Sequence, residues 1–534
     1  MTKRTHLPLS ILLAFVACAF AAGFNWHTEE TRATVRPSNL DLLIRGGQII
    51  NGSGGAPFFA DVGIKGDRIV FIGNAKKAGM SAARTIDAAN MIVAPGFIDP
   101  HTHTFEDLSN AERKSNVNYL MQGVTTVVTG NDGGGTIHVA QAFDKWAQQG
   151  IGTNAALLVG QGTVRAEVMG MSDAAPTPDQ LARMKALVLQ AMDEGATGMS
   201  TGLYYAPGSY AKTEEVIELA KVAAARGGIY DSHMRDESSY SIGLLGSIKE
   251  TIRIGREARI PVHISHIKAL GADVWGQSAK AIKLIRKARA AGINVTADQY
   301  PYTASGTNVE AALVPRWAEV GGNAQLLERI DDPAVRPRLI TEMEVNLKRR
   351  GGAEFLLITS GRDRSLIGKT LGAIARERKQ TPVETALEIV KAGGAGVASF
   401  NMNERDIENF MRQDFVMTGS DGSSGHPRKY GTFPRKLREY VFDKRIITLP
   451  FAIRASSHLT AETFGIPARG LLRRNYFADV IVFDPKTVAD RATYEQPEVL
   501  SVGMKYVIVN GQVVVDDGLY NGVFAGRPLR RLKQ

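Results

Sequence analysis

Hydrophobic positions in the middle of the chain fall into short apolar runs separated by longer amphipathic stretches. Eight runs suit strands, at 91–99, 123–129, 154–159, 197–200, 228–233, 261–266, 294–298 and 415–420. Helical periodicity lies between most of them, for instance at 246–258. Because this alternation is typical of a parallel sheet, we predict an α/β fold with a (β/α)8 TIM-like barrel. An open doubly wound sheet is the alternative, although no Gly-X-Gly-X-X-Gly follows the first strand.

Short strand patterns also occur near both ends of the chain. Residues 61–64 and 68–72 flank a Lys65-Gly66-Asp67 turn, and an Asn510-Gly511 turn interrupts the apolar run 506–515. Asn-Gly between alternating apolar residues is a strong hairpin signal. We expect the two ends to pair into one small β-sandwich beside the barrel.

The interval between the last two predicted barrel strands is too long for a plain loop. It contains a helical pattern at 382–391 and a strand pattern at 355–359, which predict an inserted subdomain over the barrel mouth. The expected organisation is therefore a signal peptide (1–21), the first part of the sandwich (22–90), the barrel (91–302), the insertion (303–410), the end of the barrel (411–470) and the rest of the sandwich (471–534).

The first 21 residues differ in composition from the rest of the chain. Lys3 and Arg4 precede an apolar run, and Ala19-Phe20-Ala21 offers a small-residue cleavage site. This pattern predicts a secretory signal and an exported protein of the bacterial periplasm, without a transmembrane span in the mature chain. The single cysteine, Cys18, lies in this segment, and lipidation there is the alternative.

Composition and charge narrow the class of partner. The chain has 534 residues, of which 44% are hydrophobic and 22% charged, and its formal net charge is +10. Basic clusters occur at Lys348-Arg349-Arg350 and at 527–533, but no aromatic residues are interleaved with them. We interpret both clusters as solvated surface charge, so the predicted partner is a small molecule and no nucleic acid. An oligomer is compatible with the sequence.

Candidate metal ligands follow several of the predicted strands. His101 and His103 follow the first strand, and residues two apart in extended chain point to the same side. Alone, such a pair is a weak signal. Further polar residues at later strand ends strengthen it: Asp132, His233, His266 and Asp421. Because the strand ends of a barrel meet at one face, we expect these residues to hold one or two divalent ions such as Zn²⁺.

Such a site supports hydrolysis by a metal-activated water. Asp421 would contact the metal and the water, acting first as general base and then as acid to the leaving group. Lys268, Tyr300 and Arg428 could bind a substrate carboxylate, and surface salt bridges are the alternative for them. His263, three residues before His266, is expected to face the opposite way and to serve in packing or in support of the site.

The chain resembles the amidohydrolase superfamily and, within it, the N-acyl-D-amino-acid deacylase (D-aminoacylase) family. The resemblance covers about 41–516 and is carried by Pro95-Gly-Phe-Ile-Asp-Pro-His-Thr-His103, Ser232-His-Met-Arg-Asp-Glu237, Ile264-Ser-His-Ile-Lys268, Asp298-Gln-Tyr-Pro-Tyr302 and Gly419-Ser-Asp-Gly422, with the 123–131 and 198–208 stretches. It implies a metal-bearing barrel with a flanking β-sandwich and an insertion. It also implies removal of an acyl group from a D-amino acid.

The resemblance assigns roles residue by residue. His233 and His266 match the principal zinc ligands, and His101 and His103 match a second, weaker metal pair. Asp421 matches the catalytic acid and base, while Lys268, Tyr300 and Arg428 match the residues that hold the substrate α-carboxylate.

Asp132 departs from the family pattern, in which a metal-binding cysteine follows Gly130-Asn131. A carboxylate can ligate or bridge zinc, but it is a harder ligand than thiolate. We favour ligation, with a loop position beside the site as the alternative.

The predicted function is therefore hydrolysis of the amide bond of N-acyl-D-amino acids, or of dipeptides with a D residue on the amine side. One rival is an amidohydrolase acting on cyclic amides, whose relatives usually carry a metal-bridging lysine; none occurs around 197–201. The other is an exported, non-catalytic binding protein on the same fold.

Overall fold

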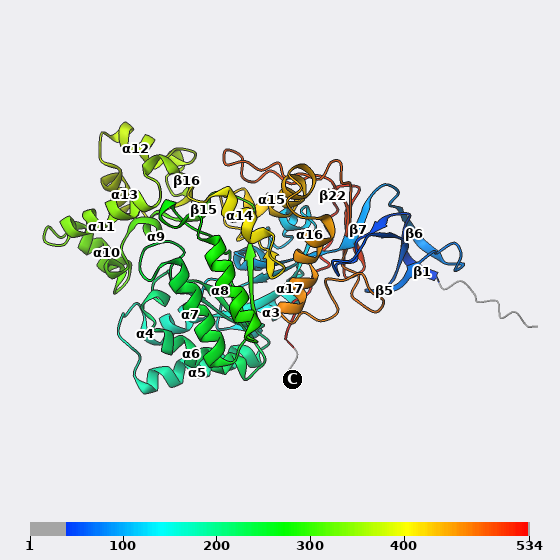
Figure 1. Ribbon diagram of the computed structural model, residues 1–534, viewed down its shortest axis with the longest axis horizontal. Coiled ribbons are helices and arrows are strands. Elements are labelled where there is room, and N and C mark those ends of the chain that lie inside the picture. The colour runs from blue at the N-terminus through cyan, green and yellow to red at the C-terminus, as the bar shows by residue number, and fades with distance from the viewer. Residues whose placement is uncertain (1–38, 532–534) are drawn as a thin grey trace, which may run out of the picture.

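The computed structural model describes residues 39–531, and its centre is an eight-stranded parallel barrel (Figure 1). The predicted signal peptide and Cys18 lie outside the described residues. Strand order follows the chain, and a parallel bridge between Thr102 and Gly422 joins the first strand to the segment after the last. The strands are β8 (Phe97–Thr102), β9 (Val124–Thr129), β10 (Asn154–Gly160), β11 (Gly198–Gly202), β12 (Ile229–His233), β13 (Val262–Ile264), β14 (Val295–Gln299) and β18 (Val416–Thr418). The predicted α/β barrel is confirmed.

The first predicted strand, 91–99, is in fact two strands in two sheets. Strand β7 (Ile92–Pro95) pairs with the sandwich strands, whereas β8 pairs with β9 in the barrel. Gly96 separates them, and a Cβ atom there would lie 2.2 Å from Thr125 Oγ1. A continuous apolar run could not reveal this division, because both strands are fully buried.

Both chain ends contribute to the β-sandwich, as predicted. One sheet has the order β5-β4-β1-β6 and the other β22-β21-β20-β19-β7-β2-β3. Asn510 and Gly511 turn the β20–β21 hairpin with φ of 49° and 81°. The strands are β1 (Asn39–Arg45), β2 (Gln48–Ile49), β3 (Phe58–Phe59), β4 (Asp61–Lys65), β5 (Arg68–Gly73), β6 (Ser81–Asp87), β19 (Val480–Phe483), β20 (Met504–Val509), β21 (Gln512–Asp516) and β22 (Leu519–Tyr520).

Helices surround the barrel and close its lower end. Leu459 and Phe464, in and after α17, pack with the inward-facing Ile98, Val128 and Met417. Because this end is filled by apolar side chains, the polar groups gather at the carboxyl ends of the strands. The helices are α1 (Phe105–Ser109), α2 (Val117–Leu120), α3 (Val139–Gln149), α4 (Gln161–Met169), α5 (Pro178–Asp193), α6 (Thr213–Ala224), α7 (Gly243–Ala258), α8 (Ser278–Ala290), α14 (Glu404–Met411), α15 (Arg428–Arg435), α16 (Leu449–Ala455) and α17 (His458–Thr463).

The segment between β14 and β18 builds a separate small sheet with its own hydrophobic core (Figure 1). Its antiparallel strands have the order β15-β17-β16, with bounds Ser305–Asn308, Ala395–Ser399 and Leu356–Gly361. Helix α14 follows it and packs against α8. The helices of this insertion are α9 (Val309–Leu313), α10 (Asn323–Asp331), α11 (Arg336–Arg349), α12 (Leu371–Arg378) and α13 (Pro382–Lys391).

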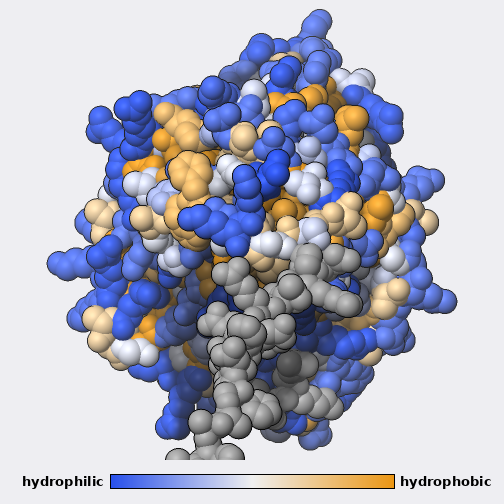
Figure 2. Space-filling model, turned by 90° about the vertical axis from the view of Figure 1, so that its right-hand side faces the viewer, coloured by the Kyte–Doolittle hydropathy of each residue, from blue (hydrophilic) through white to orange (hydrophobic). Residues whose placement is uncertain are grey.

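The sandwich end of the molecule faces the viewer in Figure 2. Hydrophobic residues are interspersed among hydrophilic ones on the part of this face that grey atoms leave visible. Across residues 39–531, no helix combines the length and the apolar character needed to cross a bilayer.

Candidate metal centre

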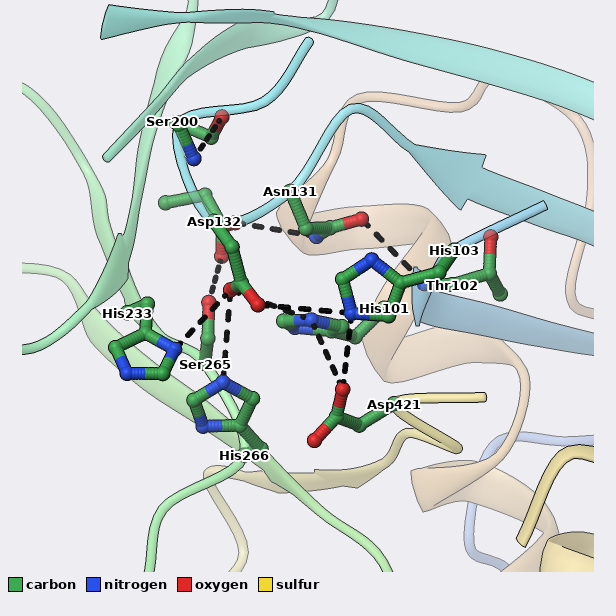
Figure 3. Close-up of polar contacts among 12 residues, drawn as sticks. His101, Thr102, His103, Asn131, Asp132, Ser200, His233, Ser265, His266 and Asp421 are labelled. Carbon is green, nitrogen blue, oxygen red and sulfur yellow. Dashed lines mark hydrogen bonds and ion pairs between the residues drawn. The ribbon is translucent and has the colours of Figure 1, made fainter. Parts of the chain in front are cut away.

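The six predicted metal-site residues converge at the carboxyl ends of the barrel strands (Figure 3). They reach the site from different elements. His101 lies within β8 and His103 just after it, Asp132 follows β9, and His233 is the last residue of β12. His266 and Asp421 follow β13 and β18 by two and three residues. The barrel topology therefore brings together groups up to 320 positions apart, counted from His101 to Asp421.

Asp132 lies at the centre of the cluster. Its Oδ1 is 3.4 Å from His101 Nε2, 3.5 Å from His233 Nδ1 and 3.5 Å from His266 Nε2. Its Oδ2 is 3.5 Å from His103 Nε2. The carboxylate thus faces all four imidazoles, which a loop residue beside the site would not do.

Asp421 approaches two of these imidazoles, His101 and His103, from the side opposite to Asp132 (Figure 3). Its Oδ1 is 3.0 Å from His103 Nε2 and 3.7 Å from His101 Nε2, and its Oδ2 is 2.8 Å from Arg428 Nη1. One carboxylate oxygen therefore faces the histidine cluster, while the other is held by a guanidinium.

The donor set fits a divalent metal. Single ligand atoms of His101, Asp132, His266 and Asp421 all lie within 4.8 Å of one another. Nε2 of His101, Nδ1 of His233 and Oδ1 of Asp132 are buried without a hydrogen-bond partner. Buried polar atoms are normally satisfied, and imidazole with carboxylate is a typical zinc donor set. A cation among these atoms would satisfy them.

Three of the site residues have left-handed backbone conformations. The φ angles are 56° for Asp132, 35° for His266 and 48° for Asp421. Such angles are uncommon outside glycine and cost free energy that the surrounding structure must supply. Each residue lies just beyond its strand. The turn there directs the side chain to the barrel axis, whatever side the alternation of strand residues would give it.

The carboxylates control the protonation of the imidazoles. Burial by itself lowers the pKa of His101, but Asp132 and Asp421 outweigh burial and raise that pKa to about 9. Burial would raise the pKa of Asp421, but Arg428 and His266 lower it well below its usual range. Protons and a cation therefore compete for the same atoms, which makes metal affinity depend on pH.

His263 does not face away from His266, and the prediction of opposite orientations was wrong. Its Nε2 is 2.8 Å from Asp298 Oδ2, and that oxygen is 3.9 Å from His101 Nδ1. The strand ends at Ile264, and the positive φ of His266 turns its ring back toward the axis. Both histidines consequently lie inside the barrel, His263 one layer below the cluster.

A cavity of about 390 Å³ opens above the cluster and contains the predicted substrate-binding residues Lys268, Tyr300 and Arg428. Lys268 Nζ donates to Glu237 Oε1 at 2.6 Å, and Arg428 Nη2 donates to Ser423 Oγ at 3.1 Å. The Tyr300 hydroxyl is buried without a partner. All three are buried, so they are not the surface salt bridges of the alternative interpretation.

Sequence reasoning missed Glu237 and Arg350. Glu237 Oε1 is 3.0 Å from His266 Nδ1 and accepts from Lys268; burial opposes ionisation, but Lys268 and His266 lower the pKa of Glu237 to about 2. Its position four residues after His233 was the available signal.

Arg350 lines the cavity and is only 2% exposed, so its assignment to solvated surface charge was wrong. The sequence pattern offered no signal for Arg350, because the insertion's fold buries it.

Comparison with known proteins relates this site to characterised enzymes. The chain matches the model of the amidohydrolase family over residues 84–515. It is 36% identical over 520 residues to D-aminoacylase of Alcaligenes xylosoxydans xylosoxydans, covering 92% of this chain and 98% of the relative.

Two solved structures are similar over most of the chain. A crystal structure of D-aminoacylase superposes with a TM-score of 0.79 at 34% identity. N-acyl-D-glutamate deacylase from Bordetella bronchiseptica, solved with zinc and a phosphonate mimic of the tetrahedral intermediate, superposes with a TM-score of 0.79 at 32% identity. Each match covers 92% of this chain and 100% of the other.

Proposed function

The chain belongs to the amidohydrolase family, and we propose that it is a zinc-dependent hydrolase that removes the acyl group from N-acyl-D-amino acids or hydrolyses dipeptides with a D residue on the amine side. The observation that carries this proposal is the convergence of four histidines, Asp132 and Asp421 below a cavity that also holds Lys268, Tyr300 and Arg428. Metal, acid and base, and carboxylate-binding groups thus share one chamber.

His233, His266 and Asp132 would hold the first zinc ion, and His101 and His103 would hold a second. When bound, zinc supplies Lewis acidity, which lowers the pKa of a water to about 7 and polarises an amide carbonyl. Asp421 accepts a proton on Oδ1, the oxygen that faces the histidines, and later donates it to the leaving amine. Arg428 fixes Oδ2 and so orients the carboxylate.

Glu237 and Lys268 together hold the ring of His266. Glu237 Oε1 lies 3.0 Å and Lys268 Nζ 2.7 Å from His266 Nδ1, and the opposite ring nitrogen, Nε2, faces Asp132. Glu237 Oε1 also accepts from Lys268, which ties the proposed substrate-binding lysine to the orientation of a metal ligand.

The substrate α-carboxylate would contact Tyr300, Lys268 and Arg428 on one wall of the cavity. The unpartnered Tyr300 hydroxyl is a free donor, and Arg428 Cζ lies 4.6 Å from the centre of the Tyr300 ring. A carboxylate fixed there leaves one direction for the acyl amide and one for the side chain at Cα, which is the geometric basis for selecting one enantiomer.

The test is an assay of zinc-loaded protein on matched N-acetyl-D- and N-acetyl-L-amino acids. Hydrolysis is measured as the release of the free amino group. We expect turnover of D enantiomers. Turnover of L enantiomers alone, or binding without turnover of any acylated substrate, would refute the proposal. Asp421→Asn should lower kcat by about 10²–10⁴-fold with little change in the thermal midpoint, because it removes the proton acceptor while keeping the side-chain volume.

Export is a further part of the proposal and rests on residues 1–21. An exported enzyme would meet cell-wall fragments that contain D-amino acids, so small D-residue peptides belong in the substrate panel. Cell fractionation with sequencing of the mature N-terminus tests this; a cytoplasmic protein that begins at residue 1 would contradict it.

A further inference from the structure

Arg350 is a buried cation that lacks a carboxylate partner within hydrogen-bonding or ion-pair distance among the described residues. Its side chain contacts neutral acceptors only: the Tyr240 hydroxyl at 2.8 Å, the Ala312 carbonyl and Ser399 Oγ at 3.2 Å, and the Tyr204 hydroxyl at 3.3 Å. Hydroxyls and a carbonyl orient a guanidinium but leave its charge uncompensated.

The other buried arginines of residues 39–531 are neutralised. Arg165 pairs with Glu215, Arg428 with Asp421 and Arg469 with Asp479. The buried Lys436 has no carboxylate at ion-pair distance among these residues, but burial lowers its pKa to about 7, and an arginine does not release its proton in this way. Taking a charge out of water is costly unless an opposite charge accompanies it. The exception at Arg350 therefore indicates an anion that arrives from outside the chain.

Arg350 reaches the cavity from the insertion. It follows α11 and lines the same cavity as the metal cluster, where it contacts Tyr204 and Tyr240. Tyr204 in turn stacks with His233 at 5.9 Å between ring centroids. One aromatic ring thus separates Arg350 from the proposed zinc ligand, a spacing that a single substrate can bridge.

We propose that Arg350 binds a second carboxylate of the substrate, in addition to the α-carboxylate. This inference rests on the proposed deacylase function and narrows it to dicarboxylic substrates. Lys268 and Arg428 are assigned to the α-carboxylate, and each also pairs with a carboxylate of the chain, whereas the planar fork of Arg350 has unused N–H groups for bidentate contact with a second carboxylate. The second carboxylate is on the amino-acid side chain or on the acyl group.

Two matched substrate pairs distinguish these sources. N-acetyl-D-glutamate is compared with N-acetyl-D-glutamine, and N-succinyl-D-leucine with N-butanoyl-D-leucine. We expect the charged member of one pair to have a kcat/KM roughly 10–100-fold higher, because hydrogen bonds to charged groups are the stronger ones. The preferred pair identifies the position of the carboxylate. Equal kcat/KM within both pairs would overturn the inference while leaving the deacylase function intact.

Three variants test the residue. Arg350→Gln should abolish the preference, mainly through KM, and leave the neutral substrate within a few-fold. Arg350→Lys should restore part of it, because charge returns without the fork. Arg349→Gln is the control, since Arg349 stacks on the same Tyr240 ring from outside the cavity. An equal loss on charged and neutral substrates in Arg350→Gln would mean that Arg350 only ties the insertion to the barrel.

Direct binding separates this inference from the proposed function. Glutarate, which has no amide to hydrolyse, is titrated calorimetrically into zinc-loaded wild type, Arg350→Gln and Arg349→Gln, with butanoate as the reference ligand. Tighter binding of glutarate that is lost only in Arg350→Gln supports the site even if no acylated substrate turns over. Equal affinities for both ligands in the wild type would overturn it.

Discussion

At the scale of the residue, Asp132 is the carboxylate that faces all four imidazoles of the candidate metal centre. Its Oδ1 faces three imidazoles and its Oδ2 faces the fourth, so one carboxylate is within reach of both proposed metal positions. A thiolate, which the family resemblance implies at this position, offers one sulfur atom, whereas a carboxylate offers two oxygens that can bind different ions. Carboxylate is also the harder ligand.

Substitution of Asp132 should therefore change the number of bound metals. We expect two zinc ions per chain in the wild type, and one or none in Asp132→Ala, with loss of hydrolysis. Elemental analysis of the two dialysed proteins measures this. Asp144→Ala, at an exposed carboxylate on α3, is the control. A single zinc ion in both wild type and Asp132→Ala would show that the histidines hold it without Asp132.

At the scale of the element, the loop after β9 packs closely against the end of β11. A Cβ atom on Gly202, at the end of β11, would lie 2.1 Å from the backbone oxygen of Asp132. Ser200 Oγ also accepts from the Gly133 amide at 3.1 Å. The left-handed turn that aims Asp132 at the histidines thus depends on close contact with β11.

Gly202→Ala should weaken zinc binding although Gly202 is no ligand. The added methyl group must displace backbone, and the supporting contacts of a metal ligand are typically worth about 10–100-fold in affinity. Gly134→Ala is the matched control, because its Cβ would meet nothing closer than the Asn131 oxygen at 3.7 Å. Competition with a chromogenic chelator measures both; equal affinities would contradict the role of Gly202.

A buried lysine behind β18 should make stability depend on pH. Burial lowers the pKa of Lys436 from 10.5 to about 7, and its Nζ donates to Thr418 Oγ1 at 2.8 Å. Between pH 7 and 10.5 the unfolded chain binds more protons, so the free energy of unfolding rises with pH by about 1.4 kcal/mol per unit. Below pH 7 the full cost of the buried charge remains.

Lys436→Met removes this term. The quantity to compare is the unfolding free energy of the variant minus that of the wild type. This difference should be larger at pH 7 than at pH 9 by roughly 2–3 kcal/mol. Thr418 Oγ1 keeps its contact with Ser456 Oγ at 2.7 Å. Lys283→Met, at an exposed position on α8, should show no such trend in denaturant titrations at the two pH values. If the difference in unfolding free energy between Lys436→Met and the wild type did not change with pH, Lys436 would not be uncharged in the folded protein.

At the scale of the whole molecule, a buried polar network joins the sandwich to the barrel. Arg469 pairs with Asp479 and donates to Asn510 Oδ1 at 2.7 Å, and Asn510 donates to Asn154 Oδ1 on β10 at 2.8 Å. Asp479 also accepts from the Asn510 amide. The β20–β21 hairpin turn of the sandwich is thereby fixed to Asn154, the first residue of β10 in the barrel.

Arg469→Met should destabilise the molecule by about 3–5 kcal/mol, because it leaves Asp479 buried without its partner. Arg84→Met is the control within the same sandwich, since it breaks an exposed pair with Asp516 and should cost less than about 1 kcal/mol. Denaturation followed by circular dichroism compares them. Equal losses of unfolding free energy in the two variants would show that the buried network stabilises the protein no more than a surface ion pair does.

The sequence by itself determined the order of strands and helices, the pairing of the chain ends and the six residues that converge at the candidate metal centre, because periodicity and strand-end position are local properties. Gly96, which splits one apolar run between two sheets, was beyond such reasoning. So were the left-handed turns at Asp132, His266 and Asp421, the inward position of His263 and the burial of Arg350. Only the tertiary structure decided these features, because each depends on contacts between segments distant in the chain.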